Sequence, residues 1–214
     1  MSIGIIGAGA LGSNFARALA KSGISATISN SRGPDSLVSL VNELGTSIKA
    51  GTVQEAASAD IVLVAVRWVD AERVLDGLPA WNGRIVIDGT NPVEFIDPAS
   101  PDANDPTNPL AVYGIKAVDL GGKHSSQIIR QFVPGARLVK AFNDLNADGL
   151  LQPAVAGGRR VLFYSGDDAD AKIQVRQVID ASGFFPVDLG ALDVGGPLAS
   201  LNGPLSAHNF VRVS

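Results

Sequence analysis

A glycine-rich turn between an apolar run and an amphipathic segment constrains this chain more than any other feature. Residues 3–6 are apolar apart from one glycine, and residues 7–12 read Gly-Ala-Gly-Ala-Leu-Gly, a G-x-G-x-x-G pattern. Residues 10–21 then place apolar side chains at helical spacing. A strand, this turn and a helix in that order are the context in which the pattern binds the pyrophosphate of a dinucleotide.

Apolar runs and amphipathic segments alternate along the rest of the chain. Further strands are expected at 24–28, near 48, and at 61–66, 84–88, 137–142, 161–164 and 185–189. Helices are expected at 34–44, after the capping box at 52–55, around 69–74, at 125–132 and at 171–179. The sequence therefore predicts an α/β fold, a Rossmann-type, doubly wound and mostly parallel sheet with helices on both faces.

Composition excludes several classes of protein. The chain has no cysteine, which excludes disulfides and thiolate metal ligands, and we expect no metal site. A net charge of -4 disfavours a protein that binds nucleic acid or an anionic membrane. The longest strictly apolar run, 61–66, is far shorter than the ~18–20 residues of a membrane span. No basic flank precedes the apolar start, so we expect a cytoplasmic protein.

The residues after the second expected strand select the kind of dinucleotide. NAD-binding proteins usually have a carboxylate there, which accepts a hydrogen bond from the ribose 2′-hydroxyl. This chain has Asn30, Ser31 and Arg32 instead. An arginine can pair with a 2′-phosphate, and the two polar side chains can donate to it. The sequence favours NADP(H), with an ordinary solvated arginine as the alternative interpretation.

Few residues are suited to acid–base catalysis. Neither tyrosine is followed by a lysine at the Tyr-x-x-x-Lys spacing, and two histidines without cysteine make a catalytic zinc improbable. We interpret His124 and His208 as surface residues and Lys140 as a solvated or capping cation, and assign no catalytic residue. A conjugated ring that accepts a hydride would require mainly stacking geometry and a dry pocket from the protein.

Five motifs together resemble the NADP oxidoreductases dependent on coenzyme F-420. These are the NADPH:deazaflavin reductases and their bacterial relatives, which are similar to the reductase domain of the STEAP metalloreductases. The motifs lie at residues 5–12, 30–34, 88–92, 139–143 and 166–168. The resemblance implies hydride transfer between NADP(H) and a small-molecule redox acceptor: the deazaflavin coenzyme F-420, a flavin such as FMN or FAD, or a quinone. It is also compatible with a homodimer.

The resemblance also implies which residues bind the cofactor. Residues of the first motif would contact the pyrophosphate, and those of the second the 2′-phosphate. Val66, at the end of the strand 61–66, and Arg67 after it would line the adenosine side, and Asn91, Pro92 and Ala141 would lie near the nicotinamide half. The implied positions are Gly7, Ala8, Gly9, Ala10, Leu11, Gly12, Asn30, Ser31, Arg32, Val66, Arg67, Asn91, Pro92 and Ala141.

The length of 214 residues predicts a single domain, 1–214, in three parts. Residues 1–92 form the dinucleotide-binding half. Residues 93–124 form a long loop, rich in proline at 97–109, with two open interpretations: a functional lid over the acceptor pocket or a flexible connection. Residues 125–214 form a second αβ half that shapes the acceptor pocket.

Two alternative functions stay open at this point. One is an imine reductase of the pyrroline-carboxylate type, whose nucleotide domain is similar but whose C-terminal region is a long array of helices. The strand patterns at 161–164 and 185–189 disfavour it. The other is a non-enzymatic regulator that senses NADPH.

Overall fold

A computed structural model describes residues 1–155 and 157–213. Its main sheet has the order β11-β10-β8-β5-β4-β1-β2-β3. Neighbouring strands are parallel except β8 and β10, which are antiparallel. The strands are β1 (Ile3–Ile6), β2 (Ala26–Ser29), β3 (Ile48–Ala50), β4 (Ile61–Val64), β5 (Ile85–Asp88), β8 (Arg137–Ala141), β10 (Gly158–Gly166) and β11 (Phe185–Asp188).

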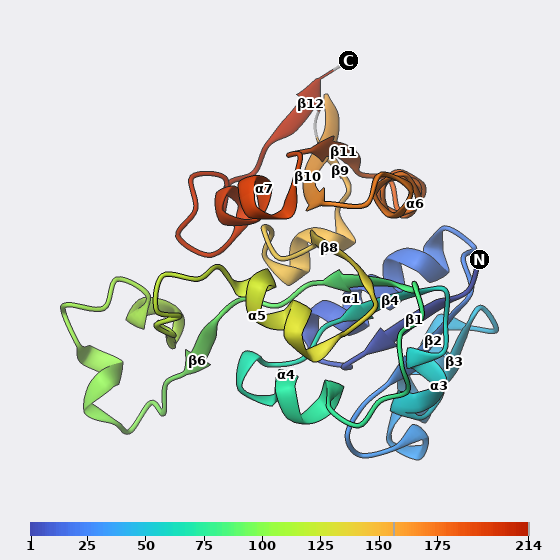
Figure 1. Cartoon of the computed structure of the whole chain (residues 1–214), viewed down its shortest axis with the longest axis horizontal. Coiled ribbons are helices and arrows are strands. Elements are labelled where there is room, and N and C mark those ends of the chain that lie inside the picture. Colours follow the sequence, from blue (N-terminus) through green and yellow to red (C-terminus); the bar gives the residue numbers. More distant parts are fainter. Residues whose placement is uncertain (156, 214) are drawn as a thin grey trace.

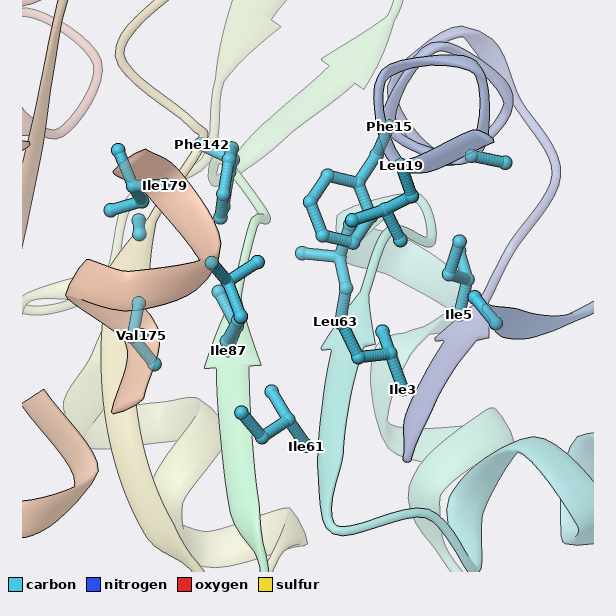
Figure 2. Close-up of a cluster of buried hydrophobic side chains, with 14 of the residues drawn as sticks. Ile3, Ile5, Phe15, Leu19, Ile61, Leu63, Ile87, Phe142, Val175 and Ile179 are labelled. Carbon is cyan, nitrogen blue, oxygen red and sulfur yellow. The ribbon is translucent and has the colours of Figure 1, made fainter. Parts of the chain in front are cut away.

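Helices cover both faces of this sheet, and strand side chains alternate between them. Ile5, Leu63 and Ile87 belong to one buried cluster, with side chains of α1 (Ala10–Lys21) and α6 (Ala169–Ala181). Figure 2 shows Phe15 and Leu19 of α1 and Val175 and Ile179 of α6 around these strands. The alternate strand residues, such as Ile6, Val64 and Val86, point to the other face of the sheet and belong to a second buried cluster. That cluster includes side chains of α3 (Val53–Ala57), α4 (Trp68–Leu75), α5 (Ser125–Phe132) and α7 (Leu192–Ala199). The predicted fold class is confirmed.

The boundaries of several elements differ from those predicted. The helix expected at 34–44 begins as a 3₁₀ turn, η1 (Pro34–Leu37), and becomes α2 (Val38–Leu44). The strand at 161–164 is longer, and its first three residues, 158–160, pair with β9 (Ala154–Val155) and β12 (Val211–Val213). Another 3₁₀ turn, η4 (Ala147–Leu151), packs on α1.

The segment 93–124 is more ordered than the long loop that the sequence predicts. A two-stranded antiparallel ribbon forms its base, β6 (Val93–Phe95) with β7 (Ile115–Ala117), and short 3₁₀ turns, η2 (Pro101–Asn104) and η3 (Ala111–Tyr113), lie beyond it. Figure 1 shows this ribbon and its tip as an arm that projects from the sheet. Within the described ranges, no helix is both long and apolar enough to cross a membrane.

Candidate active site

A cavity of about 550 Å³ opens at the carboxyl ends of β1, β2 and β4. Strand order reverses here, because β1 lies between β2 and β4. Doubly wound sheets bind nucleotides in the crevice at such a reversal. Of the predicted binding residues, the cavity lining contains Gly7, Ala8, Gly9, Asn30, Ser31, Arg32, Val66 and Arg67.

The three glycines of the turn differ in the space around them. Gly7 has a φ of +108°, and a Cβ there would lie 2.3 Å from the carbonyl oxygen of Ala65. A Cβ at Gly12 would lie 1.9 Å from the carbonyl oxygen of Gly7. At Gly9, no atom of the described residues lies within 4 Å of the Cβ position, apart from Gly9 itself and its two chain neighbours. Gly7 and Gly12 are therefore required by the fold, whereas Gly9 leaves space at the cavity for a ligand to approach the backbone.

Gly9 is also the N-cap of α1. In the described structure no side chain caps this helix, and its first turn, which includes Ala10 and Leu11, carries no acidic residue. The N–H groups of a first turn and the helix dipole both favour an anion. The start of α1 is therefore suited to bind a phosphate.

The turn after β2 is held in place by its own side chains. The Asn30 Oδ1 atom accepts a hydrogen bond from the backbone N–H of Arg32 at 3.0 Å, and the Asn30 Nδ2 atom donates to Ser36 Oγ at 2.9 Å. Arg32 itself is exposed and forms no ion pair within residues 1–155 and 157–213. Its charge is available to a ligand in the cavity.

Two more arginines line the same cavity. The guanidinium of Arg67 lies 5.4 Å from the centre of the Phe95 ring, at the base of the arm. Arg73, on α4, pairs with Asp70 at 2.6 Å. No motif marks Arg73, since its place at the cavity follows only from how α4 packs beside β4. The lining also contains Asp70 and Asp76, so three arginines against two aspartates leave the cavity with a net charge of +1. Arg32 and Arg67 are the arginines of the lining without a carboxylate partner within the described residues.

The nicotinamide positions predicted at the ends of β5 and β8 lie apart from this cavity lining. Asn91 donates through Nδ2 to the backbone oxygen of Asn143 at 2.9 Å, and Asn143 donates through Nδ2 to Asn91 Oδ1 at 3.2 Å. The same Asn143 amide donates to the carbonyl oxygen of Ala199 at the end of α7, at 2.9 Å. Pro92 follows Asn91 and is partly buried, whereas Ala141 is fully buried in the core beneath.

Phe142 bends the chain at the end of β8. Its φ of +66° lies in the left-handed region, which costs a bulky residue on the order of 1–3 kcal/mol. The ring is buried and packs against Phe15 of α1, with ring centres 4.9 Å apart. The two rings are drawn in Figure 2. Such strain persists only where the surrounding structure fixes it, and it is typical of functional sites.

The interpretation of Lys140 as a solvated cation is wrong. Its side chain is 1% exposed and its Nζ atom lies 3.1 Å from Oδ2 of Asp88, whose side chain is 0% exposed. Burial lowers the pKa of Lys140, and the facing Asp88 carboxylate opposes that shift. The local sequence pattern does not predict this ion pair, because the two residues are 52 positions apart in the chain.

Two further titratable groups lie nearby. The prediction that His124 is a surface residue is wrong, because both of its ring nitrogens are buried without a partner in the described structure, and burial lowers its pKa. Burial raises the pKa of Asp144 to about 7. His208 is exposed, as expected. Among the residues described, no cluster of three histidine, cysteine or acidic side chains is placed to hold a metal ion.

Comparison with known proteins agrees with this geometry. Residues 2–92 match the family described as NADP oxidoreductase coenzyme F420-dependent. Metalloreductase STEAP3 of Rattus norvegicus is 27% identical over 192 residues, which cover 89% of this chain and 34% of that protein. The chain thus spans about a third of the length of this curated relative.

Solved structures extend the similarity over the whole chain. A hypothetical protein from Sinorhizobium meliloti is 40% identical, with a TM-score of 0.85 over 99% of this chain and 96% of that one. A protein from Arthrobacter sp. FB24, described as a candidate F420-dependent NADP reductase, shares the fold at 24% identity, with a TM-score of 0.67 over 89% of this chain and 85% of that one. Residues 2–92 therefore match the coenzyme F420-dependent family of NADP oxidoreductases, and the structural similarity extends over nearly the whole chain.

Proposed function

We propose that this chain catalyses hydride transfer between NADP(H) and a flavin-like acceptor, either the deazaflavin coenzyme F420, FMN, FAD or a quinone. The observation that carries the proposal is the basic cavity at the ends of β1, β2 and β4, with Gly9 open to it and Arg32 unpaired within the described residues. That arrangement suits a dinucleotide with an additional phosphate on its adenosine ribose. A reductive aminase from Aspergillus terreus, determined in complex with NADPH, has the same fold at 21% identity and a TM-score of 0.62.

The direction of the bound dinucleotide follows from the sheet. With its 2′-phosphate at Arg32 and its pyrophosphate at the start of α1, the remaining half extends across the carboxyl edge toward β5 and β8. Asn91 and Pro92 lie at that end, in agreement with the roles that the family resemblance implies for them. We propose that the nicotinamide lies there and that the arm at 93–124 lies close to the acceptor.

The chemistry of this end favours an acceptor that needs no proton from the protein. The titratable groups around this end are buried: Lys140 and Asp88 pair with each other, Asp144 is 2% exposed, and both ring nitrogens of His124 are inaccessible. A deazaflavin or flavin ring can delocalise the charge that arrives with a hydride over its own heteroatoms. A carbonyl substrate would instead require a placed proton donor.

Anaerobic stopped-flow absorbance at the NADPH band tests the proposal. NADPH is mixed with the protein and, in separate runs, with coenzyme F420, FMN, FAD, a quinone and a cyclic imine. The expected result is rapid oxidation with one of the ring acceptors. Oxidation by the imine alone would favour an imine reductase. Tight NADPH binding without oxidation by any acceptor would favour an NADPH-sensing regulator.

A further inference from the structure

A buried ion pair joins β5 to β8 at the carboxyl edge of the sheet. Asp88 and Lys140 are direct neighbours in the parallel register of the two strands. Their side chains are almost completely inaccessible, and the distance between Lys140 Nζ and Asp88 Oδ2 is 3.1 Å. Because both charges lose their hydration, a buried pair is a poor source of stability compared with apolar side chains of the same volume. Its presence here calls for another role.

The pair connects the ends of both strands to the helix that covers them. The Asp88 carboxylate accepts hydrogen bonds from the N–H and the hydroxyl of Thr90, at 3.0 and 2.7 Å, and from the hydroxyl of Ser126 in α5, at 2.9 Å. The Lys140 ammonium also donates to the carbonyl oxygen of Thr90. Thr90 is therefore held by its N–H, its hydroxyl and its carbonyl oxygen.

Both loops at the nicotinamide end begin from this network. Asn91 follows Thr90 directly, and its side chain pairs with Asn143. On the other strand, Lys140 is followed two residues later by Phe142, whose φ is +66°. A displacement of the ammonium would move Thr90 and the start of the Phe142 bend together, and with them both asparagines.

We propose that Lys140 is a positioning residue for hydride transfer, which fixes the 90–91 loop and the 142–143 bend relative to each other and so sets the place of the nicotinamide ring. The inference rests on the proposed function, because it requires NADP(H) to lie across this edge. It assigns to Lys140 no contact with the cofactor. Hydride transfer depends steeply on distance and angle, and a displacement of about 1 Å can slow a reaction by roughly 100-fold.

The test separates stability from positioning with a pair of substitutions. Lys140→Met alone leaves the Asp88 carboxylate buried without its cation. Asp88→Asn with Lys140→Met removes both charges, keeps the volume and retains an acceptor oxygen for Thr90. Lys49→Met is the matched control, because Lys49 is exposed on β3, the last strand in the sheet order and remote from β5 and β8. Each protein is measured for melting temperature, NADPH affinity, nicotinamide fluorescence lifetime and the single-turnover rate of NADPH oxidation by the acceptor found active.

The double variant decides the question. We expect it to melt close to the wild type and to bind NADPH with an affinity within about twofold, because the basic cavity is untouched, yet to transfer hydride about 10- to 100-fold more slowly. A wild-type rate in a stable double variant would show that the pair serves the fold alone and would overturn the proposal. A rate that falls only in proportion to NADPH affinity would overturn it as well.

Two additional measurements keep the test decisive. If the double variant does not fold, Thr90→Val removes the 2.7 Å hydrogen bond while both charges remain, and the same slower transfer at unchanged NADPH affinity is expected. If the wild type binds NADPH but reduces no acceptor, the lifetime of the bound nicotinamide takes the place of the rate, and an unchanged lifetime in the variants refutes the positioning role. A wild type that binds no NADPH contradicts the proposed function itself.

Discussion

Replacement of Arg32 by alanine tests the basic end of the cavity. A hydrogen bond to a charged group contributes roughly 1.5–3 kcal/mol, and solvent screening reduces that value for an exposed side chain. Arg32 is exposed, and Arg67 of the same cavity, which is also exposed, would still attract the phosphate. We therefore expect Arg32→Ala to weaken NADPH binding by about 1–2 kcal/mol, which is a roughly 5- to 30-fold higher Kd.

Calorimetric titration with NADPH and with NADH measures this difference. NADH has no 2′-phosphate, so its Kd is expected to change by less than about twofold. The NADPH effect should diminish as salt is added, because exposed charges are screened. Arg176→Ala, which removes an exposed arginine on α6, is the control and should leave both affinities unchanged. Equal losses for the two nucleotides, or no loss for either, would refute the assignment of Arg32 to the 2′-phosphate.

Three other predictions concern the turn and the buried residues around the site. Gly12→Ala places a Cβ 1.9 Å from a backbone oxygen and should lower the melting temperature strongly, whereas Gly9→Val should leave melting nearly unchanged and abolish binding of both nucleotides in the same titration. Burial raises the pKa of Asp144 to about 7, above the roughly 3.9 of an unfolded aspartate, so the folded chain retains a proton that the unfolded chain releases, and stability falls as pH rises from about 4 to 7. Urea unfolding should show that Asp144→Asn removes most of this slope, on the order of 4 kcal/mol over the window, whereas the exposed Asp170→Asn leaves it unchanged. Phe142→Gly and Phe142→Ala both lose the buried ring, but glycine relieves the positive φ, so chemical denaturation should find the glycine variant at least as stable as the alanine variant; a clearly less stable glycine variant would contradict the strain.

The sequence predicts the first half of the fold well because its strands are buried on both faces. β4 and β5 are wholly inaccessible to solvent, so their residues form uninterrupted apolar runs that glycine or polar residues end. The glycine turn can also be predicted from the sequence, because a side chain at Gly7 or Gly12 would overlap a backbone carbonyl oxygen. The lining of the cavity could be predicted once the strands were known, because the carboxyl ends of parallel strands lie at the same edge of a sheet.

Elements that depend on contacts between residues far apart in the sequence cannot be predicted from the local pattern in the same way. β6 and β7 have three residues each, too few for an alternating pattern, and only their pairing defines them. The burial of Lys140 depends on Asp88 in a neighbouring strand and on Ser126 in a covering helix. A lysine near the end of a strand has the same local sequence whether it faces water or a carboxylate. Its environment is decided by strand order, which the local pattern does not contain.

α7 shows how tertiary contacts can override local preference at the site. Its sequence contains Gly195, Gly196 and Pro197, residues that disfavour a helix. A Cβ at Gly195 would lie 2.6 Å from the Ser165 side chain and 2.5 Å from that of Leu189. Only glycine therefore allows α7 to lie so close to β10, and this packing outweighs the low helix propensity of the segment. This close approach brings the carbonyl oxygen at the end of α7 within 2.9 Å of the Asn143 amide. The residues that make α7 hard to predict are therefore the ones that let it hold an asparagine at the proposed nicotinamide end.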